Sequence, residues 1–313
     1  MYGVALIMEK QDIQLNKDIK EIVEEIYQQI YCKFSEQYIV VFLCGGASNR
    51  KVKSLRDRVR VLLENEKKTL WYKPFKIFYP EDLLIEILNK TKDADLLSYE
   101  QFLASNSHVI VIICESAGSL VELGAFTNNI YTVDKVIAAV DKKLAKHKSF
   151  IMLGPIKYLK NRNKLNVIEY GQDDIEFAKR LSRDIREKNK LSGNSNSMIK
   201  LTTIVGMHYF IQLLLYFFKT LNSKELVTII EYISNKEKIV YADFKVLFNA
   251  SLKLLFQDKK IVKITGEQYS LYKLTNIGFE TIKLMINDCT RSEVCDSIRV
   301  ELMYSEFYKS PHS

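Results

Sequence analysis

The sequence predicts an α/β protein in which a doubly wound parallel sheet is followed by a mainly helical domain. The first observation is the run Val109–Ile113, which is wholly apolar and β-branched, as expected when helices cover both faces of a strand. The second is the alternation of strand-like and helix-like segments up to residue 190, which is typical of parallel sheets. The third is the small, polar stretch LSGNSNS at residues 191–197, after which the pattern becomes helical.

The segments of the first domain can be placed one by one. An amphipathic helix is expected at residues 16–34, where isoleucines and a valine recur at helical spacing. Strands are expected at residues 38–43, 75–79, 108–113, 136–140 and 166–170, which are short apolar runs bounded by turn residues. Helices are expected at residues 54–66, 83–90, 98–105 and 173–190, and directly after the strand that begins at residue 108.

The second domain has a pattern of helices followed by a hairpin. An apolar helix at residues 199–221 indicates a domain core or an oligomer interface, and helical segments follow at 223–235, 241–251 and 252–260. Two strands around Gly266 and Glu267 and a last helix complete it. This order resembles a winged helix, a helix-turn-helix variant that binds DNA in many proteins and mediates only protein contacts in others. Its basic candidates for DNA contact are Lys253, Lys259, Lys260, Lys263 and Lys273. The lack of a dense arginine cluster argues against sequence-specific operator binding.

Composition sets the frame for these assignments. A chain of 313 residues, 47% hydrophobic and 27% charged, fits about two globular domains. We therefore expect a first domain at residues 1–190 that includes the N-terminal helix, a linker at 191–197 and a second domain at 198–313. No apolar run is long enough to span a bilayer and the start lacks the features of a signal peptide, so we expect a cytoplasmic protein without membrane contact. Five scattered cysteines without a CxxC pair predict neither a disulfide framework nor a metal site.

Positive charge is concentrated in one segment. The net charge of +8 favours an anionic partner, and a cluster of basic residues follows the strand at 136–140. Its members are Lys142, Lys143, Lys146, Lys148, Lys157, Lys160, Arg162 and Lys164. Because Phe150 and Tyr158 stand among them, this basic segment could follow the phosphate backbone of a nucleic acid. The alternative is a solvated loop.

Polar and small residues gather where three predicted strands end. Gly45, Gly46 and Ser48 follow the first strand, Glu81 and Asp82 follow the second, and residues 116–122 follow the third. Because the carboxyl ends of parallel strands meet at one edge of a sheet, we expect a single cleft there. The glycine pair lacks the spacing of both a dinucleotide fold and a P-loop, which weakens those two interpretations.

Glu122 is the main catalytic candidate from the pattern alone. The small residues Ala117, Gly118 and Ser119 allow close backbone approach, and the amides that open the next helix favour an anion. Glu122 would lie near that helix start, beside the cleft. The alternative is that its carboxylate only complements the helix dipole.

Four segments carry a family resemblance. IVVFLCGG, IFYPEDLL, SYEQFLASNSHVIVIICESAGSLVELGAFTNN and KSFIMLGPIKYL, spread over residues 38–160, resemble the effector subunits of bacterial retron defence systems. The resemblance implies a nucleoside deoxyribosyltransferase-like domain followed by a winged helix. It also implies an N-glycosidase that hydrolyses NAD to nicotinamide and ADP-ribose, with NAD as substrate and no cofactor. Its implied partners are a reverse transcriptase and the multicopy DNA–RNA product (msDNA) that keep it in check, and the effector could form a higher-order oligomer or filament.

The resemblance also assigns roles to residues. The family's catalytic glutamate corresponds to Glu122, and the acidic residue after the second strand corresponds to Asp82. The nucleotide-cradling loops correspond to Gly45, Gly46, Ser116, Gly118 and Ser119, and we add Ser48, Glu81 and Asn128 as candidate substrate contacts.

Each secondary assignment has an alternative, and so does the function. Asp82 could hold ribose hydroxyls, Glu81 could cap a helix behind Pro80, and Asn128 could simply end its helix. The functional alternatives are an N-glycosidase or deoxyribosyltransferase that acts on another nucleotide, and a non-catalytic adaptor that senses a nucleotide and binds nucleic acid.

Overall fold

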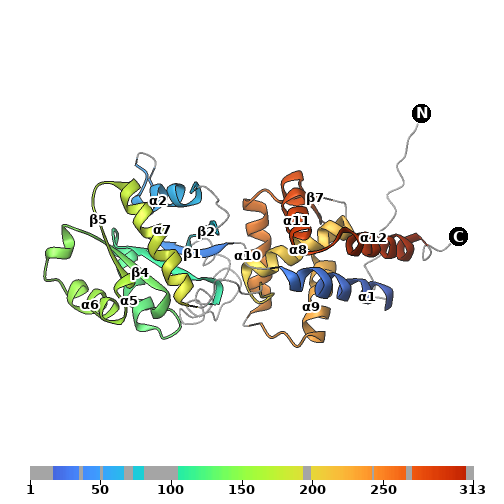
Figure 1. Ribbon diagram of the computed structural model, residues 1–313, viewed down its shortest axis with the longest axis horizontal. Helices are drawn as coiled ribbons and strands as arrows, with labels where there is room; N and C mark the ends of the chain where they lie inside the picture. Colours follow the sequence, from blue (N-terminus) through green and yellow to red (C-terminus); the bar gives the residue numbers. More distant parts are fainter. Residues whose placement is uncertain are drawn as a thin grey trace. The chain divides into compact units, whose positions relative to one another are not determined.

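The computed structural model describes residues 17–34, 38–49, 52–66, 73–80, 105–192, 199–241, 243–265 and 270–307. Contacts divide the chain into two compact units (Figure 1): Ser35–Ser197 on its own, and Met1–Phe34 together with Met198–Ser313. Most of the predicted linker at 191–197 lies outside the described residues, as do the helices expected at 83–90 and, for the most part, 98–105. Within the described ranges, no helix is long and apolar enough to cross a membrane.

The unit Ser35–Ser197 is built on a five-stranded parallel sheet of order β2-β1-β3-β4-β5. Its strands are β1 (Ile39–Cys44), β2 (Phe75–Phe78), β3 (Val109–Ile113), β4 (Val136–Asp141) and β5 (Val167–Tyr170). All four pairings are parallel, and the central strand β3 is fully buried along its length. The predicted doubly wound α/β fold is therefore confirmed.

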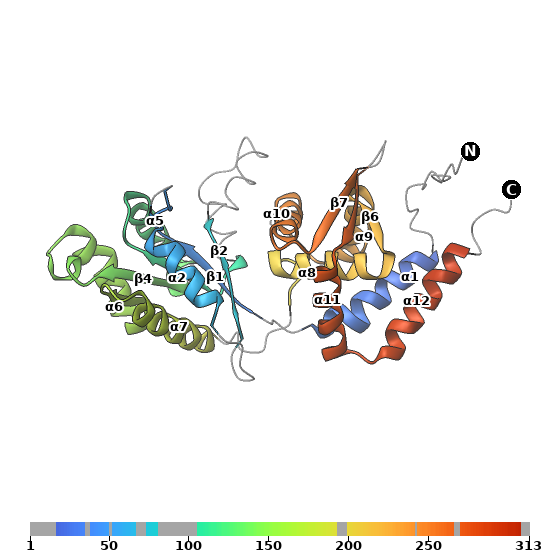
Figure 2. The same cartoon turned by 90° about the horizontal axis from the view of Figure 1, so that it is seen from above.

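Helices cover both faces of this sheet (Figures 1 and 2). On one face, α2 (Leu55–Glu64) and α7 (Asp174–Leu191) contact each other, and Val59 and Leu181 join Val111 in one buried cluster. On the other face, α5 (Ala117–Asn128) contacts β3 and β4. Successive side chains of a strand point to opposite faces, so the buried residues that alternate with that cluster, such as Ile112, face α5.

Short helical segments lie between β3 and α7. They are the 3₁₀ turns η3 (Val133–Lys135), η4 (Leu144–Lys146) and η6 (Lys164–Asn166), the π-helical segment η5 (Met152–Ile156) and the helix α6 (Lys157–Arg162). The segment η5 contacts both α5 and α6, so these three elements form one side of the unit.

In the described residues between 199 and 307, the second unit shows five helices and a small antiparallel sheet. Along the chain these are α8 (Ile204–Phe218), β6 (Thr220–Asn222), α9 (Ser223–Lys236), α10 (Phe244–Gln257), β7 (Ile261–Thr265), β8 (Ser270–Leu274), α11 (Asn276–Cys289) and α12 (Ser292–Phe307). The sheet order is β6-β8-β7, and β7 and β8 form the predicted hairpin. The order helix, strand, two helices and hairpin is the one that a winged helix requires.

Two details of this unit differ from the sequence prediction. The segments expected at 241–251 and 252–260 form the single helix α10, because the junction Ser251–Leu252 contains neither Gly nor Pro to interrupt it. The strand β6 was not predicted, because three residues are too few to show an alternating pattern.

The N-terminal helix belongs to the second unit and not, as the sequence predicts, to the first domain. The helix α1 (Lys17–Glu25) and the turns η1 (Ile26–Ile30) and η2 (Tyr31–Lys33) belong to the unit of α8–α12. Tyr31 packs against Phe210 of α8 with ring centroids 5.1 Å apart, and Glu24 forms an ion pair with Lys236 of α9. Helical spacing identifies the apolar stripe of such a helix, but the surface that covers it is decided by tertiary packing.

The start of α11 requires a glycine. Thr275 caps this helix by accepting a hydrogen bond from the Gly278 amide at 3.1 Å. A Cβ atom at position 278 would stand 2.0 Å from the carbonyl oxygen of Lys260, so no side chain fits without moving the backbone. Gly124 in α5 has no atom within 4 Å of the corresponding position.

We expect Gly278→Ala to lower the free energy of unfolding by about 1–3 kcal/mol, because the methyl group overpacks a backbone contact. The matched variant Gly124→Ala should raise it by about 0.5–1 kcal/mol, because alanine loses less backbone entropy in a helix. Urea denaturation of the full chain measures both changes. Equal effects of the two substitutions would contradict the close contact at Gly278.

Candidate functional site

The site lies at the carboxyl edge of the parallel sheet. The strand order places β1 between β2 and β3, so the connections leave β1 and β3 in opposite directions and open a crevice between their ends. Ligands of doubly wound proteins bind at this switch point. Gly45, Gly46 and Ser48 follow β1 here, and residues 114–116 follow β3.

Glu115 connects the loops after β3 and β1. Its Oε1 atom accepts hydrogen bonds from the amide of Gly46 at 3.0 Å and the amide of Arg56 at 3.3 Å. Gly45 makes this approach possible, because a Cβ atom there would lie 3.1 Å from the Glu115 carboxylate and 3.0 Å from the Cβ atom of Arg56. Sequence reasoning did not select Glu115, although a carboxylate directly after a buried strand was a usable signal.

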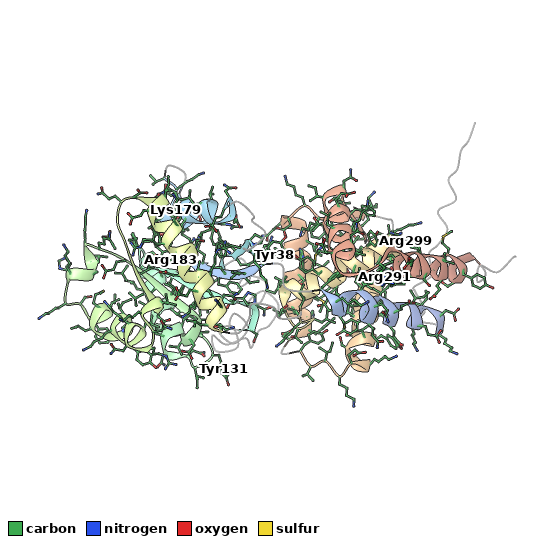
Figure 3. The ribbon with its side chains drawn as sticks, in the orientation of Figure 1. Tyr38, Tyr131, Lys179, Arg183, Arg291 and Arg299 are labelled. Atoms are coloured by element: carbon green, nitrogen blue, oxygen red, sulfur yellow. The ribbon has the colours of Figure 1, made fainter. Side chains whose placement is uncertain are left out.

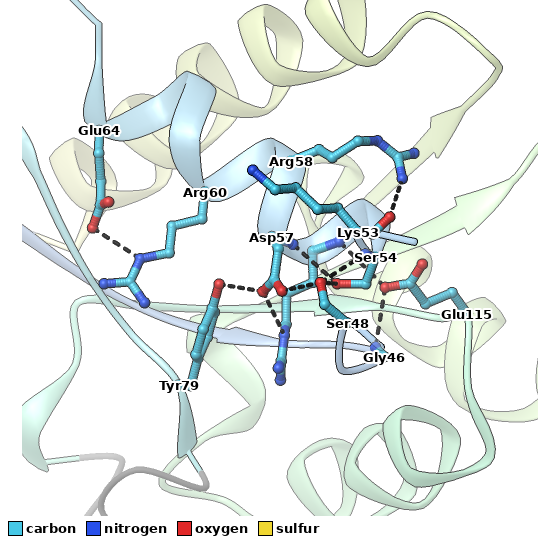
Figure 4. Close-up of polar contacts among 11 residues, drawn as sticks. Gly46, Ser48, Lys53, Ser54, Asp57, Arg58, Arg60, Glu64, Tyr79 and Glu115 are labelled. Carbon is cyan, nitrogen blue, oxygen red and sulfur yellow. Dashed lines mark hydrogen bonds and ion pairs between the residues drawn. The ribbon is translucent and has the colours of Figure 1, made fainter. Parts of the chain in front are cut away.

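Asp57 connects the loops after β1 and β2 through the first turn of α2 (Figure 4). Ser54 caps this helix and accepts from the Asp57 amide at 3.2 Å. One carboxylate oxygen of Asp57 accepts from the Ser48 hydroxyl and the other from the Tyr79 hydroxyl. The Ser48 oxygen also accepts from the Ser54 amide at 2.9 Å. The predicted residue Ser48 therefore supports the loop through defined bonds.

The ring of Tyr79 lies within reach of two guanidinium groups. The Cζ atom of Arg56 is 4.0 Å from the ring centroid and that of Arg60 is 4.6 Å away, which are cation–π distances. Burial and donation to Asp57 raise the pKa of Tyr79 to about 12, so its hydroxyl keeps its proton at neutral pH. Because Tyr79 directly follows β2, these contacts fix the chain at the carboxyl end of that strand.

A polar pocket of about 640 Å³ adjoins this network. Its lining includes Ser48, Lys53, Asp57, Arg60 and Tyr79. Both cations and carboxylates face it, so the pocket suits a ligand with hydroxyl and anionic groups together.

The start of α5 is held by its own serines. Ser116 and Ser119 form a reciprocal capping box in which Ser119 donates its amide to the Ser116 hydroxyl at 3.2 Å and the Ser116 amide donates to the Ser119 hydroxyl at 3.1 Å. Ser119 is buried. These two predicted residues therefore shape the helix start with their side chains, while the amides of Ala117 and exposed Gly118 have no acceptor within the helix.

Glu122 lies on the flank of α5 that faces β1. With 100° per residue, Ser119, Leu123 and Phe126 form the buried side toward the sheet. Gly124 lines a groove against η5 on one flank, and Glu122 lies on the other, one turn after Gly118. The segment of η5, α6 and η6 packs on β4, and β1 lies on the other side of β3, so the half-buried Glu122 is turned away from β4 and toward the switch point.

Not all predicted site residues meet at this point. Asn128 lines the groove against η5, on the flank of α5 opposite Glu122. Glu81 and Asp82 lie outside the described residues. Among the described residues, no group of three or more His, Cys, Asp or Glu side chains is arranged to hold a metal ion.

The basic side chains of the segment at 142–164 are all exposed. All eight predicted residues, Lys142, Lys143, Lys146, Lys148, Lys157, Lys160, Arg162 and Lys164, are solvent-exposed. Arg162 differs from the lysines because it forms an ion pair with Asp134 at 2.7 Å. In the second unit, Lys259, Lys263 and Lys273 are exposed, whereas Lys260 lies 3.9 Å from Asp258.

Comparisons with known proteins agree on one family. A family model described as "STM3845 retron effector protein" matches residues 52–263. An Escherichia coli protein named "Retron Ec86 putative ribosyltransferase/DNA-binding protein" is 26% identical over 280 residues, which cover 86% of this chain and 85% of that protein. The similarly named retron Ec73 protein of Escherichia coli is 32% identical over 120 residues, which cover 37% of this chain and 36% of that protein.

The Asp57 network gives a pH-dependent prediction. Burial raises the pKa of Asp57, but hydrogen bonds from Ser48 and Tyr79 together with the charges of Arg56 and Arg60 outweigh it and hold the pKa below the ordinary value of 3.8. A carboxylate with a depressed folded-state pKa contributes stability that is complete above its unfolded pKa and lost as the pH falls through the folded pKa.

We expect Asp57→Asn to lower the free energy of unfolding by about 1–3 kcal/mol at pH 7, because hydrogen bonds to a charged acceptor are lost. The difference from the unsubstituted protein should begin to narrow below about pH 4, the pKa of Asp in the unfolded chain, and be lost as the pH falls through the lower pKa of Asp57 in the folded protein. Urea denaturation of both proteins at a series of pH values measures this difference in the free energy of unfolding. Asp134→Asn, which removes an exposed ion pair, should have a smaller effect. A difference that does not change with pH would contradict the role of the carboxylate charge.

Proposed function

This chain belongs to the STM3845 retron effector family, and from that premise we propose that it is an N-glycosidase that hydrolyses NAD to nicotinamide and ADP-ribose. The observation that carries the proposal is the position of Glu122, on the flank of α5 that faces the switch point of the sheet. The name "ribosyltransferase" given to two relatives supports a reaction at a ribosyl bond.

A single carboxylate suits cleavage of an N-ribosyl bond. The bond breaks through a cationic sugar, which a carboxylate can stabilise by its charge or trap covalently. Glu122 takes this role in the proposal, and water then attacks the anomeric carbon to give ADP-ribose. The exposed amides at the start of α5 offer donors for phosphate oxygens, whereas the Gly46 amide already donates to Glu115.

The leaving group favours NAD over ordinary nucleosides. Nicotinamide departs as a neutral molecule from a pyridinium, so a strong general acid is unnecessary. A purine or pyrimidine would need a proton as it leaves, which Asp82 or Glu81 would have to supply. In the proposal, Asp82 acts either as the second catalytic carboxylate or as a ligand of the ribose hydroxyls.

The remaining parts of the proposal concern control of the activity. As a retron effector, the chain would be held inactive by a reverse transcriptase and its msDNA, and released or activated during phage infection. The name "DNA-binding" given to the relatives supports a nucleic acid partner. The unit of α8–α12 has the element order of a winged helix, but α10, at the position of the recognition helix, carries only two lysines and no arginine. This composition favours contacts with protein or with phosphates over base reading.

We expect Glu122→Gln to abolish nicotinamide release while leaving the urea denaturation curve unchanged, because the two side chains are nearly equal in size and only the charge is lost. The protein is incubated with NAD, alone and assembled with its reverse transcriptase and msDNA, and nicotinamide is followed by chromatography. Glu169→Gln, an exposed position on β5, is the matched control and should keep full activity.

Turnover by Glu122→Gln at the unsubstituted rate would refute the catalytic role of this residue. If no assembly state releases nicotinamide, NAD is not the substrate, and release of bases from other nucleotides would then identify a different N-glycosidase or deoxyribosyltransferase.

A further inference from the structure

A groove on the unit Ser35–Ser197 lies apart from the proposed active site. It has a volume of about 650 Å³ and runs between the outer flank of α5 and the segment of η5 and α6. Val121, Gly124 and Asn128 form one wall, and Phe150, Pro155 and Tyr158 are part of the other. Glu122, the only charged residue of α5, faces the opposite flank of that helix.

The walls of this groove expose apolar side chains that a folded chain normally buries. Phe150 is 89% exposed, Val121 is 71% exposed and Tyr158 is 48% exposed. Leu153, beside the groove, is exposed as well. Apolar patches of this kind on a soluble unit mark binding surfaces. Two of the exposed side chains, Phe150 and Tyr158, are aromatic rings that could stack on a planar ligand.

The surroundings of the groove carry charge of one sign. No Asp or Glu occurs between residues 142 and 168, while seven lysines and Arg162 do. Lys146 and Lys148 precede Phe150, and Lys157 directly precedes Tyr158, whereas Lys160 lies on the opposite side of α6 from that ring. Among the described residues none of the lysines is paired with a carboxylate, whereas Arg162 is neutralised by Asp134. The groove is therefore lined by exposed rings, and the segment that forms its outer wall carries the unneutralised cations.

We propose that this groove binds a single-stranded polynucleotide, with bases stacked on Phe150 and Tyr158 and phosphates held by the neighbouring lysines. Aromatic platforms edged by cations are the common design of sites for single strands, and they tolerate any sequence because every base has a π face. A duplex presents phosphates but keeps its bases stacked inside, so it can use only the lysines. The inference rests on the proposed function only in that the effector works beside a nucleic acid, and it does not require NAD to be the substrate.

The test uses the full chain and fluorescence anisotropy with labelled 20-nucleotide single strands of mixed sequence, one of DNA and one of RNA. Phe150→Ala should weaken binding about 5- to 100-fold, because one stacked base is lost. Lys148→Glu combined with Lys157→Glu should weaken binding and reduce the dependence of log K on log salt by about 0.7 for each lost phosphate contact. Unlabelled duplex of the same sequence should compete less well than unlabelled single strand.

Matched controls come from the opposite face of the sheet. Lys179 and Arg183 extend from α7 (Figure 3), and both are exposed. Lys179→Glu should leave binding unchanged, and so should Ile175→Ala, which removes an exposed apolar side chain at the start of α7. Because Phe150 and Lys157 are exposed, their substitutions should not affect the denaturation curve, which is recorded for each variant.

The outcomes separate this inference from the proposed activity. Glu122→Gln should bind single strands like the unsubstituted protein, whether or not the latter releases nicotinamide from NAD. Binding of neither DNA nor RNA, or equal binding by Phe150→Ala, the double lysine variant and Lys179→Glu, would overturn the proposal. Equal competition by duplex and single strand would also overturn it, because the rings would then contribute nothing. Preference between the DNA and RNA strands would identify which polynucleotide the groove accepts.

Discussion

The complete burial of β3 is the constraint on which the unit Ser35–Ser197 depends. All five of its side chains are excluded from solvent, so both faces of the sheet must be covered. α2 and α7 cover one face and α5 covers the other. Parallel strands need crossover connections, which return each chain segment to the same edge of the sheet. The loops after β1 and β3 therefore meet at one edge, where the candidate site lies.

The first turn of α2 converts this shared edge into a fixed site. Its backbone binds Glu115 from the loop after β3, and its Asp57 side chain binds Ser48 after β1 and Tyr79 after β2. Three connections that are distant in sequence thereby depend on one helix terminus, where carboxylates are favoured by the dipole. Groups held in this way need little reorganisation when a ligand binds, which is what a site for a charged transition state requires.

α5 carries two chemically different flanks. Gly118 and Glu122 are on the flank toward β1, and the exposed apolar residues and Asn128 are on the flank toward η5. Its third side, with Leu123 and Phe126, is buried against the sheet. One helix thus presents its carboxylate to the switch point and an apolar wall to the groove.

The sequence by itself determined the parallel sheet, the position of Glu122 at the beginning of α5 and the charge of the basic segment, because these follow from local periodicity and composition. It also predicted the crevice after β1 and β3, while the places of Glu81 and Asp82 in it remain predictions. Only the tertiary structure showed that Glu115, Asp57 and Tyr79 join the loops, and that α1 packs on α9 and α12. It also placed Asn128 in the groove and committed Ser116 and Ser119 to capping. These contacts join residues far apart in the chain or depend on which side of a helix is covered, and neither property leaves a periodic signal in the sequence.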